Sequence, residues 1–256
     1  MTTDRPKMSP KRKFRLARTS LIALVLVALG IAAIAELVSP SAGDPARPSD
    51  VEYLDLAALD PSEGGRIPAQ TSEPIPETEE LTSMPHATRP AKGAPWTYSI
   101  RVEKGLDPHG EFASLVERLL ADPRGWSQKK RFERAKQGET PSFWVVLASP
   151  PNVDRLCAPL RTEGTYSCGL TGIAVINAVR WRDGPVETAR QAWSGESIES
   201  YRTMVLNHEV GHVLGLGHQG CRTPGEPASI MAQQTIDLKG CTPNPWPKDE
   251  DLALVS

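Results

Sequence analysis

The sequence has no excess of charge of either sign and few cysteines. Lys and Arg number 29 against 31 Asp and Glu, which gives a formal net charge of −2. The chain therefore lacks the basic surplus typical of nucleic-acid-binding domains, and we expect no nucleic-acid partner. The first of the four cysteines is Cys157, so lipid attachment to a cysteine near the N-terminus is not expected.

The apolar run Leu21–Ala35 is shorter than the ~20 residues that a membrane-spanning helix prefers. It follows a basic segment, residues 1–19, and acidic residues come after it, so we expect the N-terminus inside the cell and the rest outside. Residues 20–38 form either a retained signal anchor, which the long polar head favours, or a signal peptide. A signal peptide would be cut after Ala35, where small residues fit a cleavage site. These alternatives predict a single-pass cell-membrane protein and a secreted protein, respectively.

Residues 39–94 are rich in Pro, Ser, Thr, Glu and Ala and have little apolar periodicity. A segment of this composition cannot bury enough apolar surface to offset the loss of chain entropy. We expect a disordered, Pro-rich linker between the membrane and the following domain.

Residues 95–256 are numerous enough for one domain with a well-buried core. Alternation over 96–102 and an apolar run over 142–148 predict strands. Between these two strands, apolar residues with helical spacing after Asp107-Pro108 predict a helix. Residues 248–254 predict a short terminal helix with an acidic first turn.

Two histidines in this domain have the spacing of metal ligands. His208 and His212 are four residues apart, so on a helix they lie on one face, one turn apart, and can bind one zinc ion. Glu209 lies between them, within reach of a metal-bound water. Ser197 is a suitable N-cap for this helix.

A third histidine follows a helix-ending glycine. Gly215 tolerates the left-handed conformation that ends a helix, so the chain can turn back and bring His218 to the metal. Three protein ligands leave a position open for water, which is typical of catalytic zinc. The alternatives are three ordinary surface histidines, which we disfavour, and a zinc site without catalysis.

The cysteines suit disulfide bonds better than metal binding. They contain no short C-x-x-C pair, which argues against zinc ligation by cysteine. All four lie on the expected outer, oxidising side of the membrane. Of the three possible pairings, we favour Cys157–Cys168 and Cys221–Cys241, because each closes a local loop.

The pattern H-E-x-x-H-x-x-G-x-x-H at residues 208–218, with Ser229-Ile230-Met231 after it, resembles the metzincin superfamily of zinc endopeptidases. It is also similar to a family of uncharacterised actinobacterial secreted or membrane-anchored proteins. The metzincin resemblance implies an α+β zincin fold, with a twisted mixed sheet packed on an active-site helix. It implies that His208, His212 and His218 hold Zn²⁺, that Glu209 is the general base, and that Met231 forms a Met-turn beneath the metal without binding it.

In metzincins the strand at the sheet edge, ahead of the active-site helix, pairs with the extended substrate. The β-branched run Leu170–Val179 is our candidate for that strand, and a buried central strand is an equally good interpretation. The sequence departs from better-known metzincins at Gln219 and has no tyrosine just after Met231. The linker contains no cysteine that could keep the enzyme latent.

The sequence therefore predicts a zinc-dependent extracytoplasmic endopeptidase. We expect a monomer that acts on peptide or protein substrates and is held to the membrane by its N-terminal helix. The alternatives are a cell-envelope amide hydrolase and a non-catalytic, zinc-containing peptide-binding domain. Glu209 argues against the last alternative, because a structural zinc site needs no base beside it.

Overall fold

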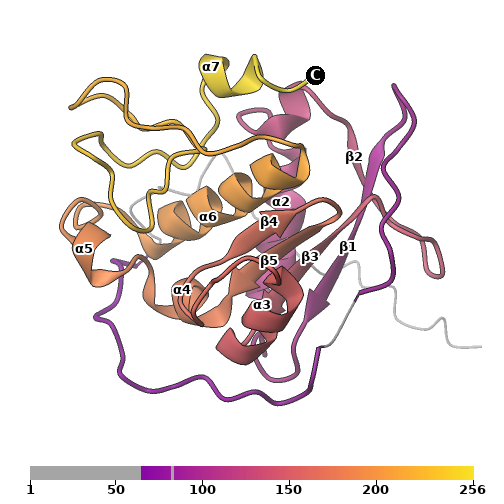
Figure 1. Cartoon of the computed structure of the whole chain (residues 1–256), viewed down its shortest axis with the longest axis horizontal. Coiled ribbons are helices and arrows are strands. Elements are labelled where there is room, and N and C mark those ends of the chain that lie inside the picture. The colour runs from indigo at the N-terminus through magenta and orange to yellow at the C-terminus, as the bar shows by residue number, and fades with distance from the viewer. Residues whose placement is uncertain (1–64, 82–83) are drawn as a thin grey trace, which may run out of the picture. The chain divides into compact units, whose positions relative to one another are not determined.

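The most apolar stretches of the domain form the middle of a β-sheet. The computed structural model describes residues 65–81 and 84–256. Its strands are β1 (Trp96–Val102), β2 (Phe132–Arg134), β3 (Phe143–Ala148), β4 (Cys168–Leu170) and β5 (Ile173–Asn177). They form one five-stranded sheet in the spatial order β2-β1-β3-β5-β4 (Figure 1). Neighbouring strands are parallel except that β4 is antiparallel to β5, which confirms the expected mixed sheet.

Helices connect and follow the strands: α2 (Glu111–Ala121), the 3-10 helix η1 (Trp126–Gln128), α3 (Pro150–Cys157), α4 (Ala178–Asp183), α5 (Glu187–Arg190), α6 (Ile198–Val213) and α7 (Asp249–Leu252). The expected strands, the histidine-bearing helix and the terminal helix are confirmed. The helix expected to open at Asp107-Pro108 begins instead at Glu111, because Gly110 occupies the N-cap. Asp107 still caps it, since its Oδ2 accepts a hydrogen bond from the amide of Phe112 at 3.0 Å.

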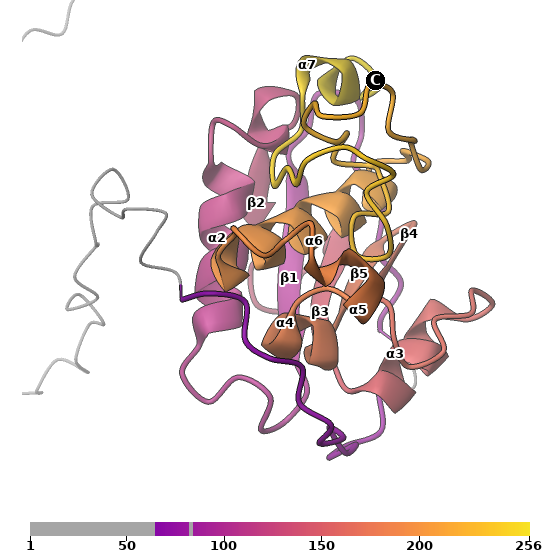
Figure 2. The ribbon, with the colours of Figure 1, turned by 90° about the vertical axis from the view of Figure 1, so that its left-hand side faces the viewer.

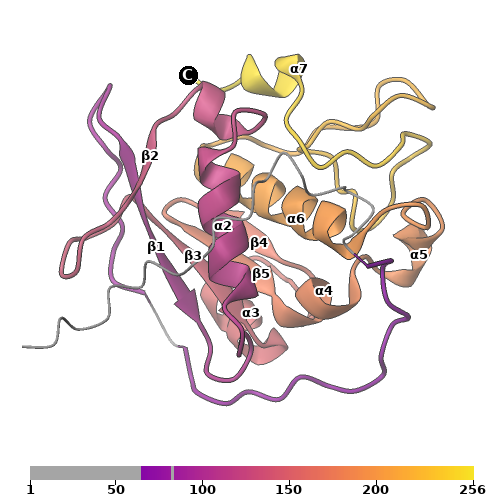
Figure 3. The same ribbon diagram turned by 180° about the vertical axis from the view of Figure 1, so that it is seen from behind.

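The sheet is covered on both faces, because alternate residues of a strand point to opposite sides. Val145 and Leu147 of β3 belong to the larger core cluster, which α2 and α6 cover (Figure 3). Val146 and Ala148 belong to a smaller cluster on the other face, beneath α3 (Figure 2).

The described part of the expected linker is ordered, and this corrects the predicted domain boundary. Residues 65–81 and 84–94, here called the N-terminal strap, run along the domain before β1 (Figure 1). Leu81 is 1% exposed and belongs to the smaller core cluster, and its amide donates to Oδ1 of Asn152 at 2.7 Å. Composition alone missed this, because one well-placed leucine covers sheet surface that would otherwise face water.

The run Leu170–Val179, expected to be a single strand, is divided in the structure. Its middle forms β5, which lies between β3 and β4, so the central-strand interpretation holds for that part. The edge position belongs to β4, which begins at Cys168. The run ends in α4, because the side chain of Asn177 caps that helix by accepting from the amide of Val179 at 2.9 Å.

The predicted basic segment (1–19), membrane segment (20–38) and first part of the linker (39–64) lie outside the described residues. Within residues 65–81 and 84–256, none of the helices has both the length and the apolar character needed to cross a bilayer.

Candidate metal centre

Helix α6 brings the histidine motif into the interior of the domain. Its N-cap is Ser197, as the sequence predicts, and the Ser197 hydroxyl accepts from the amide of Ser200 at 3.0 Å. The helix packs against β4, β5 and α2 and is buried along most of its length. Leu206 and Val210 face the larger core cluster, while His208 and Glu209 line a cavity.

The imidazole rings of His208, His212 and His218 converge on one point. The Nε2 atom of His212 lies 3.1 Å from Nε2 of His208 and 3.1 Å from Nε2 of His218. Two nitrogens bound to one tetrahedral zinc at about 2.0–2.1 Å are about 3.3 Å apart, so the observed spacing matches that of a metal site.

Backbone carbonyls fix the orientation of two of the rings and turn their Nε2 atoms toward this point. The Nδ1 atoms of His208 and His212 lie 2.8 Å from the carbonyl oxygens of Ile230 and Leu216, respectively. A carbonyl only accepts, so each Nδ1 carries a hydrogen, and in a neutral ring Nε2 is then an acceptor. Two facing lone pairs repel each other unless a cation lies between them, so the donor set fits a metal ion.

The turn after α6 places the third histidine. Gly215 has a φ of 97°, and its amide donates to the carbonyl of His212 at 2.9 Å. The amide of Leu216 donates to the carbonyl of Gly211 at 3.0 Å. These two bonds form a Schellman cap, which reverses the chain toward His218 as the sequence predicts.

The segment Ser229–Met231 lies directly beneath the histidines. The Ile230 carbonyl holds His208, and the Met231 carbonyl accepts from the amide of Gln219 at 2.9 Å. Met231 is fully buried beside Gly211, where a Cβ would clash with its Sδ. Sequence reasoning missed Asp251 of α7, which accepts from the hydroxyl of Ser229 and, at 3.1 Å, from the amide of Ile230.

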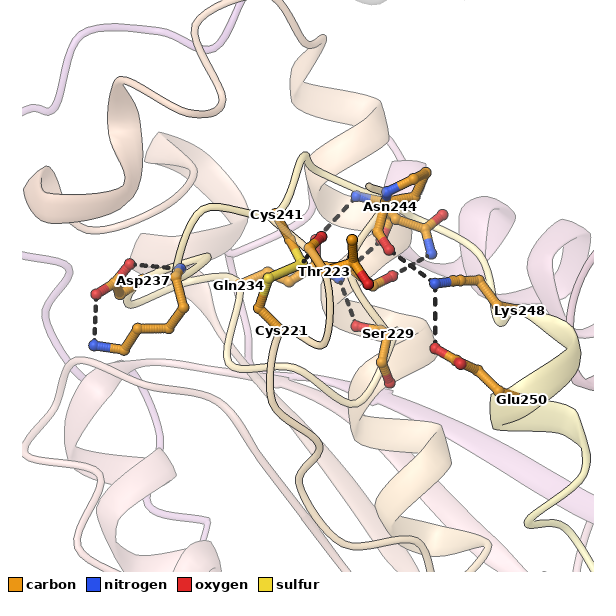
Figure 4. The surroundings of a disulfide bond; sticks show 12 residues. Cys221, Thr223, Ser229, Gln234, Asp237, Cys241, Asn244, Lys248 and Glu250 are labelled. Atoms are coloured by element: carbon orange, nitrogen blue, oxygen red, sulfur yellow. Dashed lines mark hydrogen bonds and ion pairs between the residues drawn. A yellow bond between two sulfur atoms is a disulfide. The ribbon is translucent and has the colours of Figure 1, made fainter. Parts of the chain in front are cut away.

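Disulfide bonds join Cys221 to Cys241 and Cys157 to Cys168, and none of the described cysteines is free. The first disulfide ties the chain just after His218 to the chain that follows Met231 (Figure 4). Beside it, the amide of Asn244 donates to Oε1 of Gln234 at 2.9 Å, and the side-chain nitrogen of Gln234 donates to the Asn244 carbonyl at 2.9 Å.

The histidines open onto a cavity of about 520 Å³. It is lined by residues of the segment Leu160–Gly169, which ends in β4, and by residues 232–236, which follow Met231. Gly169 allows β4 to lie against α6, since a Cβ there would come within 2.6 Å of the Cβ of His212. A substrate in the cavity would therefore lie between a sheet edge and the histidine cluster.

Burial tunes the ionisable groups of the site. It lowers the pKa of His208 to about 3 and lowers the pKa values of His212 and His218, so the three rings stay neutral, as metal ligands must be. Burial also raises the pKa of the Glu209 carboxyl to about 8.

Residues 72–248 match a family described as protein of unknown function (DUF3152). The chain belongs to this family. In this DUF3152 chain the matched segment begins within the N-terminal strap and includes the three histidines, Glu209, Met231 and all four cysteines. No curated protein matches the DUF3152 chain.

The remaining histidines of the DUF3152 chain, His86 and His109, lie on the surface and outside the cluster. Every predicted ligand therefore meets at the site, together with Glu209. The backbone carbonyls that orient the rings were not predicted. Every residue has a backbone carbonyl, so the sequence does not indicate which one accepts a hydrogen bond from a histidine.

Proposed function

We propose that this domain is a zinc-dependent peptidase of the metzincin type that acts outside the cytoplasm. The observation that carries the proposal is the convergence of the Nε2 atoms of three histidines, with neighbouring atoms 3.1 Å apart, beside the buried carboxyl of Glu209. The H-E-x-x-H-x-x-G-x-x-H pattern and the methionine beneath it support the metzincin assignment. Two disulfides support an oxidising compartment, and therefore export by the N-terminal segment.

His208, His212 and His218 would hold the zinc ion. When bound, Zn²⁺ supplies Lewis-acid polarisation of the scissile carbonyl and makes a water molecule more acidic. The carbonyls of Ile230 and Leu216 orient two of the ligand rings and raise their basicity through Nδ1–H hydrogen bonds.

Glu209 acts as the general base. Its carboxyl lines the same cavity, and a neighbouring cation would favour the ionised form that burial disfavours. The carboxylate takes a proton from the attacking water and passes it to the leaving amine.

Strand β4 provides a template for the substrate backbone. It is the last strand of the sheet, and one of its edges pairs with β5. An extended peptide could add to its other edge through main-chain hydrogen bonds. This assigns to β4 the role that the sequence suggested for Leu170–Val179.

The test compares the full-length, oxidised protein with two variants, Glu209→Gln and His212→Ala. We expect one zinc per chain in the parent and in Glu209→Gln, measured by atomic emission, and little in His212→Ala. Mass spectrometry of a peptide library should show cleavage by the parent and a loss of about 10²–10⁴-fold in Glu209→Gln.

Cross-linked cell-wall peptides belong in the same assay. Cleavage of these peptides alone would favour a cell-envelope amide hydrolase. Zinc binding without any cleavage would favour a non-catalytic peptide-binding domain, and absence of zinc from the parent would refute the metal centre.

A further inference from the structure

A chain of hydrogen bonds runs from His208 to a buried carboxylate that the proposed mechanism does not use. The Nδ1–H group of His208 donates to the carbonyl of Ile230, with the nitrogen and oxygen 2.8 Å apart. That carbonyl and the amide of Met231 belong to one peptide group, and the amide donates to Oγ of Ser229 at 3.1 Å. The Ser229 hydroxyl in turn donates to Oδ1 of Asp251. We call these three hydrogen bonds the Ser229–Asp251 relay.

Every hydrogen bond of the relay runs in the same direction. The ring donates to the carbonyl, the peptide amide donates to the hydroxyl, and the hydroxyl donates to the carboxylate. A group that donates a hydrogen bond becomes a better acceptor at its other end, so bonds in such a series strengthen one another. The relay therefore increases the electron density at Nε2 of His208, the atom that lies 3.1 Å from Nε2 of His212.

The carboxylate at the end of the relay is buried and is held by neutral donors. Asp251 is 1% exposed. Besides the Ser229 hydroxyl, the backbone amides of Ile230 and Lys248 donate to its Oδ2 at 3.1 and 2.9 Å. These donors hold the carboxylate without cancelling its charge. The charge acts strongly on the relay, because the effective dielectric constant of a buried site is lower than that of water.

The ring of His212 provides an internal comparison. Its Nδ1 lies 2.8 Å from the carbonyl of Leu216, so its orientation is fixed in the same way as that of His208. The amide in the same peptide group belongs to Gly217, and within residues 65–81 and 84–256 it donates to no backbone carbonyl. The Leu216 carbonyl thus orients a ligand ring without a link to Asp251.

We infer that Ser229 and Asp251 are positioning residues of the metal centre, which make Nε2 of His208 a stronger metal ligand through the Ser229–Asp251 relay. Neither residue lines the cavity, so both act only through the histidine. The inference rests on the proposed function and adds two residues that tune its metal ion. Loss of a group that hydrogen-bonds to a ligand histidine costs about 10–100-fold in metal affinity.

The first experiment measures the zinc affinity of the full-length, oxidised protein by competition with a chelator. Asp251→Asn removes the charge and keeps the shape of the side chain, and Ser229→Ala removes the middle of the relay. We expect each variant to bind zinc about tenfold more weakly than the parent. The double variant should bind no more weakly than the weaker single variant, because a broken relay cannot transmit the charge.

Two variants of α7 separate the relay from surface charge and from stability. Asp249→Asn makes the same change of charge at an exposed position outside the relay. Leu252→Ala removes a side chain of the larger core cluster, so it should lower the free energy of unfolding while the relay stays intact. Both variants should keep the zinc affinity of the parent.

The second experiment needs no metal. The sequence has five histidines, so the ring N–H signals of the zinc-free, full-length protein can be assigned one by one by NMR of isotopically labelled histidine. Asp251→Asn and Ser229→Ala should move the Nδ1–H proton signal of His208 upfield, because its hydrogen bond weakens. The signal of His212 should stay in place, since that ring lies outside the relay.

An unchanged His208 signal in folded Asp251→Asn would overturn the inference, and so would an equal loss of zinc affinity in Leu252→Ala. Additive effects of Ser229→Ala and Asp251→Asn would also overturn it, because the two residues would then act separately. Zinc binding without peptide cleavage would refute the peptidase and uphold the relay if the two variants weaken that binding. Absence of zinc from the parent would refute the metal centre, and the His208 signal would still decide whether the relay exists.

Discussion

The rings of His208 and His212 are oriented by carbonyls from two different segments. One carbonyl belongs to Ile230 of the Met-turn and the other to Leu216 of the helix cap. Each bond fixes the hydrogen on Nδ1 and leaves Nε2 free to bind a metal. The orientation of the histidine rings is therefore set by backbone position as well as by their spacing on the helix.

Gly211 of α6 lies against Met231, and Gly211→Ala tests that contact. The new Cβ would clash with the Sδ of Met231 and lie 3.1 Å from Cζ2 of Trp126. We expect a loss of about 1–3 kcal/mol in the free energy of unfolding and weaker zinc binding, measured by urea titration and competition with a chelator. Gly195→Ala is the control, because a Cβ at Gly195 meets nothing within 4 Å. Equal stability of the two variants would contradict the close contact.

At the scale of elements, the N-terminal strap, β1 and α3 are joined through one buried carboxylate. Glu103 accepts from the amides of Thr78 and Ser149 at 2.9 and 2.7 Å, and from Nδ2 of Asn152 at 2.8 Å. Asn152 in turn accepts from the amide of Leu81. The strap is therefore held by specific hydrogen bonds as well as by apolar burial.

This network predicts a pH dependence of stability. Burial alone would raise the pKa of Glu103, but hydrogen bonds from Thr78, Asn152 and Ser149 outweigh it and lower the pKa. A carboxyl whose pKa is lower in the folded state stabilises the fold above its unfolded pKa of about 4.5, and loses this effect as the pH falls through its folded pKa. Glu103→Gln should therefore cost about 2–3 kcal/mol at pH 7 and much less at pH 3.

Urea unfolding of the full-length parent and Glu103→Gln at both pH values checks this prediction. Glu133→Gln is the control, because Glu133 is exposed on β2 and its contact is an exposed ion pair with Arg131. A stability difference between the parent and Glu103→Gln that is the same at pH 7 and pH 3 would contradict the role of the carboxylate.

At the scale of the whole molecule, the two disulfides close two different loops that line the cavity. Cys157–Cys168 closes the loop that contributes Leu160–Ser167, and Cys221–Cys241 encloses the Met-turn and the wall after it. Only the second loop contains Ile230 and Met231, which support the histidines.

We therefore expect loss of either disulfide to lower the stability of the fold, but loss of only one of them to weaken metal binding. Replacement of either pair by serine should cost about 3 kcal/mol, because the separations of 11 and 20 residues enter the loop-closure entropy only through their logarithm. We expect only Cys221→Ser/Cys241→Ser to weaken zinc affinity markedly, as measured by chelator competition. An equal loss of affinity in Cys157→Ser/Cys168→Ser would contradict a specific link between the Met-turn and the metal centre.

Much of the candidate site follows from local spacing. The i, i+4 histidines, the N-cap Ser197 and the helix-ending Gly215 obey rules of a single helix, and the structure has them where those rules place them. The short elements β2, α3, α4 and α5 were not foreseen, because segments of three to eight residues carry little periodicity.

Interactions between distant segments cannot be predicted from local spacing. The burial of Leu81, the edge position of β4 and the burial of Arg180 each depend on which segments meet in space. Residue identity determined the ligand types, their spacing on α6 and the turn toward His218, since these arise within one stretch of backbone. Only tertiary packing decided which carbonyls orient the rings, what covers the second face of the sheet and which charged side chains are buried, because burial and pairing depend on neighbours that lie far apart in the chain.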